Sequence, residues 1–148
     1  MITTRLATTD DLDWMLNELR AFDAFFASRV SLFPDDEHAV GVLVGLIMEH
    51  VVFVAESDRV PVGFIAGVLA PHFFNPAIRH LSELFWWVVP SARGTSAGAR
   101  LLARFESVGR ARADWITMTL EADSPVNPSA MLKRGYRAKE TNYLLEVA

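Results

Sequence analysis

A run of small residues, Gly94-Thr95-Ser96-Ala97-Gly98, separates a strand-like segment from a helix-like one. The apolar, aromatic residues before Pro90 predict a buried strand over 81–89. After the run, apolar residues recur at helical spacing and predict a helix from about Ser96 to Arg112. The first N–H groups of a helix have no internal partner and carry the positive end of its dipole. Small residues let an anion approach them, so the sequence predicts a phosphate-binding loop.

The charges after this loop favour the same reading. Between Arg93 and Arg112 the chain has five arginines and one acidic residue, Glu106, although its net charge is −4. Arginine matches the geometry of phosphate oxygens, so a basic helix on an acidic protein suits a polyphosphate ligand. The alternative is a helix start with a solvated arginine face and no ligand.

The same residues also fit Gly-x-Ser-x-Gly, the nucleophile elbow of α/β-hydrolases. In that fold the histidine of the triad follows the serine in the chain. Here all four histidines, His38, His50, His72 and His80, precede Ser96. The hydrolase interpretation is therefore excluded.

The elements that must hold this loop follow from hydrophobic periodicity and turn residues. Helices are expected from about Thr9 to Ala27, from the segment Phe33-Pro34-Asp35-Asp36 to roughly His50, from about Ser96 to Arg112, and briefly up to about Arg134. Strands are expected near residues 2–6, 51–56, 60–69, 81–89, 115–121 and 136–147. Gly63 and Gly67 within one strand indicate a close backbone approach or a bulge. The order indicates an α/β fold with a mixed, mostly antiparallel sheet and helices on both faces.

Composition narrows the classes of function. The length of 148 residues suits one domain over 1–148, and 51% hydrophobic residues exclude a disordered chain. The acidic balance argues against nucleic-acid binding, and the absence of cysteine excludes disulfides and thiolate chemistry. The scattered histidines give no metal-ligand spacing. Neither a signal peptide nor a membrane span is expected, so we expect a cytoplasmic protein with no membrane partner.

The element order and two short motifs resemble the GNAT family of acyl-CoA-dependent N-acetyltransferases. The family signature, Arg/Gln-x-x-Gly-x-Gly/Ala at a strand-to-helix junction, is matched by Arg93 and Gly98, with Ser96 where glycine is usual. A serine N–H donates as a glycine N–H does, provided that φ is negative. The residues 127–130, Asn-Pro-Ser-Ala, and 133–136, Lys-Arg-Gly-Tyr, resemble two further family elements.

This resemblance implies a twisted sheet of six to seven strands flanked by about four helices, with the fourth and fifth strands splayed around the cofactor. It implies acetyl transfer from acetyl-CoA, by direct attack, to a primary amine of a small molecule or peptide. A homodimer is compatible with it. It assigns cofactor binding to Trp87, Val88, Val89, Arg93, Gly94, Thr95, Ser96, Ala97, Gly98, Ala99, Arg100 and Asn127.

Amine acetylation needs a base for the ammonium proton, and Glu83 is the leading candidate. Strand alternation predicts that Glu83 shares a face with Phe85 and Trp87, and a carboxyl among aromatic rings has a raised pKa. The alternative is an ordinary solvated charge at the start of the strand. His72 and His80 are further candidates for the base.

The proton donor to the leaving thiolate is less evident. In many family members it is a tyrosine, at a position that Met131 occupies here. Tyr136 is therefore the remaining catalytic candidate, with a core position as its alternative reading and water as the alternative donor. His72, Phe73 and Phe74 are candidates for the acceptor site. Met131 and Ser96 leave open a second function, a degenerate module that binds acyl-CoA without catalysis.

Overall fold

The computed structural model describes residues 1–26 and 30–147. Its sheet has the order β1-β2-β3-β4-β5, and every neighbouring pair is antiparallel except β4 and β5. The elements are β1 (Ile2–Leu6), α1 (Leu12–Phe25), α2 (Asp36–Glu49), β2 (Val51–Ser57), β3 (Val60–Pro71), β4 (Arg79–Val88), α3 (Ala97–Arg112), β5 (Trp115–Thr117) and α4 (Pro128–Lys133). Among the described residues, no helix combines the length and hydropathy that crossing a bilayer requires.

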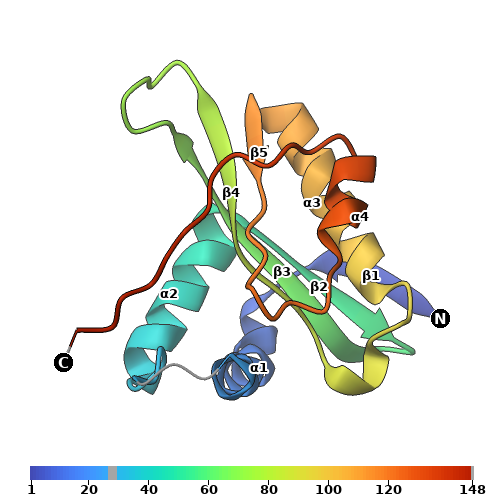
Figure 1. Cartoon of the computed structure of the whole chain (residues 1–148). Coiled ribbons are helices and arrows are strands. Elements are labelled where there is room, and N and C mark those ends of the chain that lie inside the picture. The colour runs from blue at the N-terminus through green and yellow to red at the C-terminus, as the bar shows by residue number, and fades with distance from the viewer. Residues whose placement is uncertain (27–29, 148) are drawn as a thin grey trace.

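The sheet carries helices on both faces, as the sequence predicted (Figure 1). On one face α1 and α2 bury Met15, Leu19 and Leu43 against β2 and β3. On the other face α3 buries Leu101 and Phe105 against the same strands. Because each helix presents one apolar stripe to the sheet, both faces of the central strands are covered.

A β-bulge interrupts the pairing of β3 with β4. Ala66 pairs with Phe85 and Gly67 pairs with Glu83, so Leu84 is an extra residue in β4. Gly67 accommodates the ring of Phe105, since a Cβ on Gly67 would lie 2.6 Å from that ring and 2.7 Å from the Ser82 carbonyl oxygen. The predicted close approach at Gly67 is confirmed, and the bulge lies beside it.

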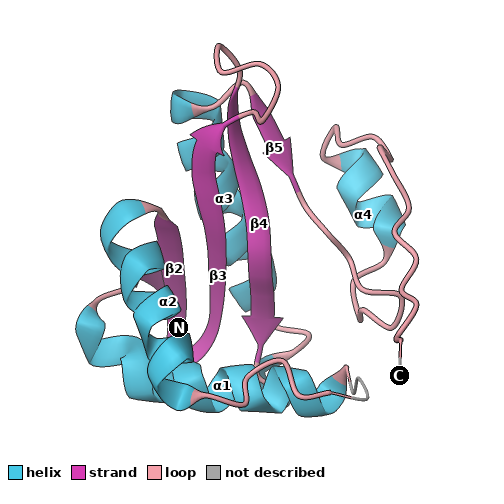
Figure 2. Cartoon of the chain, turned by 90° about the vertical axis from the view of Figure 1, so that its left-hand side faces the viewer, coloured by secondary structure: helices cyan, strands magenta, loops and turns pink. Residues whose placement is uncertain are grey.

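The strands β4 and β5 run parallel for only three residue pairs, the last joining Ser82 to Thr117. The chain after Thr117 then diverges from β4, which continues to Val88 (Figure 2). The connection between the two strands is α3, as expected for a parallel pair. The splay between the fourth and fifth strands, which the family resemblance implied, is present.

The predicted strand over residues 136–147 is wrong. Those described residues form no strand, so the sheet has five strands rather than six to seven, and β5 ends at Thr117 instead of extending to 121. A strand needs both a neighbouring edge and a buried face. The consecutive apolar residues Tyr143, Leu144 and Leu145 are all more than 80% exposed, so neither condition is met.

The first helix is shorter than predicted. A 3₁₀ turn at Thr9–Asp11 precedes α1, which ends at Phe25, and the predicted end at Ala27 lies outside the described residues. The Asp11 carboxylate accepts the Thr8 N–H and pairs with Arg5 at 2.7 Å, which joins this turn to β1. The start of the helix is therefore tied to the sheet by an ion pair as well as by apolar packing.

The contact at Gly67 gives a prediction on stability. We expect Gly67→Ala to destabilise the protein by about 1–3 kcal/mol, because neither the buried Phe105 ring nor the Ser82 backbone can move away cheaply. Gly41→Ala is the control: it lies within α2 with nothing within 4 Å of the added Cβ, and should stabilise by about 0.5–1 kcal/mol. Urea unfolding measures both. Equal stability of the two variants would contradict the packing described here.

Candidate active site

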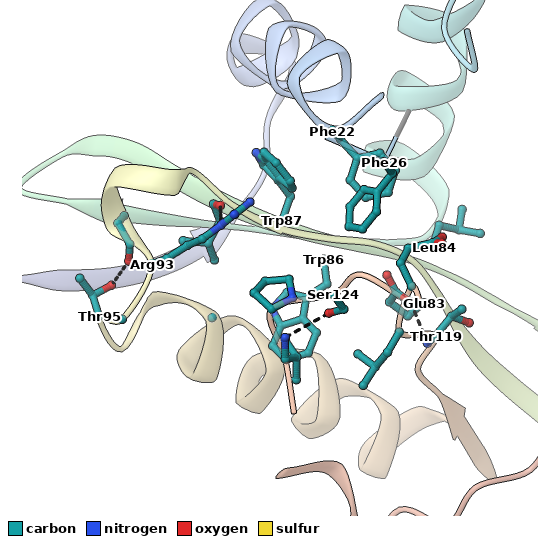
Figure 3. A pocket seen from close by; sticks show the side chains of 18 residues that line it. Phe22, Phe26, Glu83, Leu84, Trp86, Trp87, Arg93, Thr95, Thr119 and Ser124 are labelled. Atoms are coloured by element: carbon teal, nitrogen blue, oxygen red, sulfur yellow. Dashed lines mark hydrogen bonds between the residues drawn. The ribbon is translucent and has the colours of Figure 1, made fainter. Parts of the chain in front are cut away.

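A pocket of about 240 Å³ lies where β4 and β5 part (Figure 3). Its walls come from the end of α1, the second half of β4, the loop before α3 and the chain after β5. The lining residues are Phe22, Phe26, Glu83, Leu84, Trp86, Trp87, Val88, Ala92, Arg93, Gly94, Thr95, Gly98, Thr119, Leu120, Glu121, Ser124, Pro125 and Val126. The predicted phosphate loop and Glu83 therefore belong to the same pocket.

The loop end of the pocket is built around the N-terminus of α3. Gly94 adopts a φ of +83°, which favours glycine, and lets the chain turn from β4 into the helix. The Thr95 hydroxyl donates to the Ala92 carbonyl at 2.7 Å and accepts the Ala97 N–H at 3.2 Å. Ser96 is the N-cap of α3, with a φ of −77°, so the condition under which it can replace a glycine is met.

The glycines of this loop test whether an anion fits. A Cβ at Gly94 would meet nothing within 4 Å, so the surface there is open. Gly98 lines the pocket, and a Cβ on it would lie 3.6 Å from Val88 Cγ2 and 3.7 Å from Trp86 Cζ2. Because Gly98 has no Cβ, the first turn of α3 stays accessible, and the backbone N–H groups of that turn lack helical partners. The loop therefore fits a phosphate group.

Arg93 is held firmly on one side of the pocket. Its guanidinium carbon lies 4.7 Å from the ring centroids of both Phe25 and Trp87, and its Nε donates to the Val88 carbonyl at 3.1 Å. The Trp87 indole N–H in turn donates to Glu18 of α1 at 2.8 Å. These contacts join α1 to the loop and place a cation at the loop end of the pocket.

Glu83 lies at the other end and is only 8% exposed. Its Oε2 accepts the backbone N–H of Thr119 at 3.1 Å. Burial raises the pKa of Glu83 to about 7, and nearby Glu121 adds to the rise, while the Thr119 N–H opposes it. The alternative of a solvated charge is wrong, and the carboxyl can exchange a proton near neutral pH.

The predicted face of Glu83 is also wrong. Phe85 and Trp87 pack in the core against α1 and α2, whereas Glu83 pairs with Gly67, whose open side faces Phe105 of α3. The extra residue Leu84 shifts the alternation by one position, so Glu83 lies on the α3 side. Burial near α3, rather than the aromatic rings of β4, accounts for the raised pKa.

Comparison with known proteins agrees with this geometry. The family model "Acetyltransferase (GNAT) family" matches residues 10–136. The chain belongs to the acetyltransferase (GNAT) family. Membership makes the protein an acyltransferase with acetyl-CoA as its cofactor. No curated protein gives a significant sequence match.

Solved structures share the GNAT fold along their whole length. A transcriptional regulator from Bacillus halodurans C-125 is 16% identical with a TM-score of 0.77, covering 99% of this chain and 100% of its own. A predicted acetyltransferase with acetyl-CoA from Clostridium acetobutylicum is 16% identical with a TM-score of 0.75, covering 100% and 96%. A ribosomal-protein-alanine N-acetyltransferase from Brucella melitensis biovar Abortus 2308 is 15% identical with a TM-score of 0.76, covering 100% and 99%. At these identities the likeness shows the fold.

Half of the predicted cofactor residues line the pocket of this GNAT fold, and the other half do not. Those outside are Val89, Ser96, Ala97, Ala99, Arg100 and Asn127. The Val89 N–H donates to the Val62 carbonyl, and the exposed Arg100 donates from Nε to the Ser96 hydroxyl. Asn127 caps α4 through the Ser129 N–H at 2.9 Å and follows Val126, which does line the pocket.

Tyr136 does not reach the pocket. Its backbone N–H bonds back to Met131 as α4 ends, and its ring lies on the side of α3 where Arg134 pairs with Glu106 at 2.6 Å. Burial, and then the Glu106 carboxylate, raise the pKa of the hydroxyl. Met131 is 7% exposed. Tyr136 therefore joins the α3–α4 packing and is removed from Glu83.

The predicted acceptor residues also lie elsewhere. Phe73 and Phe74 are 90% and 86% exposed in the loop between β3 and β4, and neither they nor His72 line the pocket. His72 accepts the Phe74 N–H and packs its ring against Trp115. Because β3 and β4 form a long hairpin, this loop projects past the start of β5 (Figure 1). His80 bonds to the Thr117 hydroxyl at 2.8 Å and also lies outside the pocket lining.

Sequence reasoning missed several residues that line the pocket at the Glu83 end, among them Phe22, Phe26, Thr119 and Glu121. Phe22 and Phe26 are four residues apart at the end of α1, a spacing that indicates one helical face. Thr119 and Glu121 follow the strand that lies parallel to β4, so they emerge at the same edge as Glu83. That neighbouring position was the available signal.

The raised pKa of Glu83 gives a prediction on stability. Its folded pKa of about 7 exceeds the ordinary 4.5, so its contribution to stability is complete below pH 4.5 and is lost as the pH rises through 7. Between pH 5 and pH 8, the free energy of unfolding of the wild type should fall by on the order of 2–3 kcal/mol more than that of Glu83→Gln. Urea unfolding at several pH values measures this, and Glu140→Gln, at an exposed site, should parallel the wild type. A Glu83→Gln curve parallel to the wild type would contradict the burial of this charge.

Proposed function

We propose that residues 1–148 form one N-acetyltransferase domain, which moves an acetyl group from acetyl-CoA to a primary amine of a small molecule or peptide by direct attack. The observation that carries the proposal is the pairing, in one pocket, of the α3 N-terminus with a buried carboxyl of pKa about 7. The structural neighbour named as a ribosomal-protein-alanine N-acetyltransferase supports an amine acceptor.

The residues suited to hold the cofactor are those of the loop and of β4. The backbone N–H groups of Gly94–Ala99 suit the pyrophosphate, because the helix dipole favours negative charge there. The backbone of Trp87–Val89 suits the pantetheine, since beyond Ser82 the edge of β4 has no β5 partner. Asn127 adjoins the opposite wall. Bound acetyl-CoA supplies the activated acetyl thioester.

The proton chemistry falls to Glu83. A primary alkylamine is present mainly as the ammonium ion at neutral pH, and it must lose a proton before it can attack. The Thr119 N–H holds Oε2 of Glu83, which orients the carboxyl and leaves Oε1 to take the proton. With a pKa of about 7, the carboxylate is ionised often enough and is also basic enough to serve. Among the described residues, the pocket lining includes no tyrosine, lysine or histidine, so we assign protonation of the leaving group to water.

A second candidate function is a degenerate module that binds acyl-CoA without turnover. Met131, where a donating tyrosine is usual, is the observation that favours it. Incubation with acetyl-CoA and a panel of amines, while free thiol is followed, separates the two functions. Thiol release that depends on the amine supports the enzyme, whereas binding without release supports the module.

The loop gives a prediction on cofactor binding. Gly98→Asp should weaken acetyl-CoA binding by roughly 100-fold or more, because a carboxylate would face the phosphate groups at the start of α3. Gly98→Asn is the matched control, since it adds nearly the same volume without the charge, and should bind clearly more tightly than Gly98→Asp. Calorimetry measures both. If both variants bind equally well, the phosphate site lies elsewhere.

Glu83 gives a prediction on catalysis. Glu83→Gln should lower kcat by roughly 10²-fold or more and leave the Kd for acetyl-CoA nearly unchanged, because the amide keeps the shape but cannot accept the proton. In the wild type, kcat should rise with pH to a plateau above about 7 as the carboxyl ionises. Steady-state rates from pH 5.5 to 9 test both points. A variant that keeps the wild-type rate and pH profile would exclude Glu83 as the base.

A further inference from the structure

We propose, on the basis of this function, that the acceptor is an arylalkylamine, a protonated primary amine on a short chain that carries an aromatic ring and no carboxylate. Phe22 and Phe26 would receive the ring, and Glu121 would attract the ammonium group toward Glu83. Phe22 and Phe26 line the pocket away from Arg93 and Thr95 of the phosphate loop (Figure 3). Glu121 also lines the pocket and lies close enough to Glu83 to act on its titration.

The charges of the pocket are divided between its two ends. Arg93 is the cation among the lining residues of the described chain, and it lies at the loop end. The two lining carboxylates, Glu83 and Glu121, lie at the opposite end, close enough that Glu121 acts on the titration of Glu83. Glu121 is exposed and Glu83 is buried, so negative charge runs from the mouth inward. This arrangement attracts a cationic acceptor.

The same charges discriminate against other amines. An amino acid brings a carboxylate next to its amine, and the two glutamates offer that carboxylate no positive partner. A diamine brings a second ammonium group, which would have to lie against the rings of Phe22 and Phe26 without solvent. An amine with an apolar body meets neither penalty.

The apolar wall formed by Phe22 and Phe26 is aromatic. Phe22 and Phe26 lie with ring centroids 4.6 Å apart, and Phe22 also contacts Phe85 edge-on at 5.6 Å. Both rings are partly buried, so one surface of the pair remains free toward the pocket. Leu84 and Leu120 add apolar surface at the same end, and Leu84 is 45% exposed. Edge-to-face packing on phenylalanine favours an aromatic body over a thin alkyl chain.

The test compares the acetylation of 2-phenylethylamine with that of n-butylamine, 1,4-diaminobutane and phenylalanine at one pH. We expect kcat/KM for 2-phenylethylamine to exceed each of the others by at least about 10-fold. A kcat/KM for phenylalanine or for either alkyl amine equal to that for 2-phenylethylamine overturns the inference and leaves the proposed function standing. Absence of thiol release with every amine, while acetyl-CoA still binds, overturns both.

Variants of Phe26 test whether the preference for an aromatic amine comes from the Phe22–Phe26 wall. Phe26→Ala should raise the KM for 2-phenylethylamine about 10-fold and change the KM for n-butylamine less than about 2-fold, with the KM for acetyl-CoA unchanged. Phe26→Leu keeps apolar volume without the ring and provides a second reading if the alanine variant folds poorly. Phe73→Ala is the matched control, since that ring is 90% exposed and outside the pocket. Equal effects of Phe26→Ala on all amines would overturn the role of the wall.

The charge is tested separately. Glu121→Gln should raise the KM for 2-phenylethylamine several-fold, and added salt should reduce the difference from the wild type, because the carboxylate is exposed. Glu140→Gln, also exposed but outside the pocket lining, should leave the KM unchanged. An unchanged KM in Glu121→Gln would remove Glu121 from acceptor recognition.

Discussion

The parting of β4 from β5 is the constraint on which the rest of the site depends. The two strands share three residue pairs, after which the Thr119 N–H reaches across to the side chain of Glu83 instead of to a backbone carbonyl. The helix α3 packs closely on β5 just before the strands part, because a Cβ at Gly109 would lie 2.4 Å from Ile116. The helix N-terminus, the open edge of β4 and the buried carboxyl consequently meet in one pocket.

That arrangement opposes two physical tendencies. A sheet edge leaves unpaired backbone groups, and a buried carboxyl loses hydration when it ionises. In the proposed complex both have a use: the backbone edge of β4 would offer hydrogen bonds to the pantetheine, and the loss of hydration keeps the pKa of Glu83 at about 7. Arg93 contacts the rings of both Phe25 and Trp87, and these contacts hold its side chain in place at the loop end of the pocket.

The sequence predicts the parts of this site that depend on local order. The strand, loop and helix around residues 94–98 follow from spacing and residue size, and the structure contains them. The face of Glu83 was mispredicted because one bulged residue, Leu84, reverses the alternation along β4. The residue types around Leu84 do not indicate a bulge. Phe73 and Phe74 looked suitable by type, but the length of the β3–β4 hairpin carries them beyond the pocket. Phe22 and Glu121 enter the site through tertiary packing, which one sequence cannot supply.

The central claim is that the pocket between β4 and β5 brings the cofactor from the α3 N-terminus to Glu83. A crystal structure of the protein with coenzyme A tests it most directly. The account predicts the pyrophosphate on the backbone of Gly94–Ala99, with the sulfur end of the cofactor beside Glu83 and Thr119. A cofactor bound outside this pocket, or one whose sulfur points away from Glu83, would contradict it.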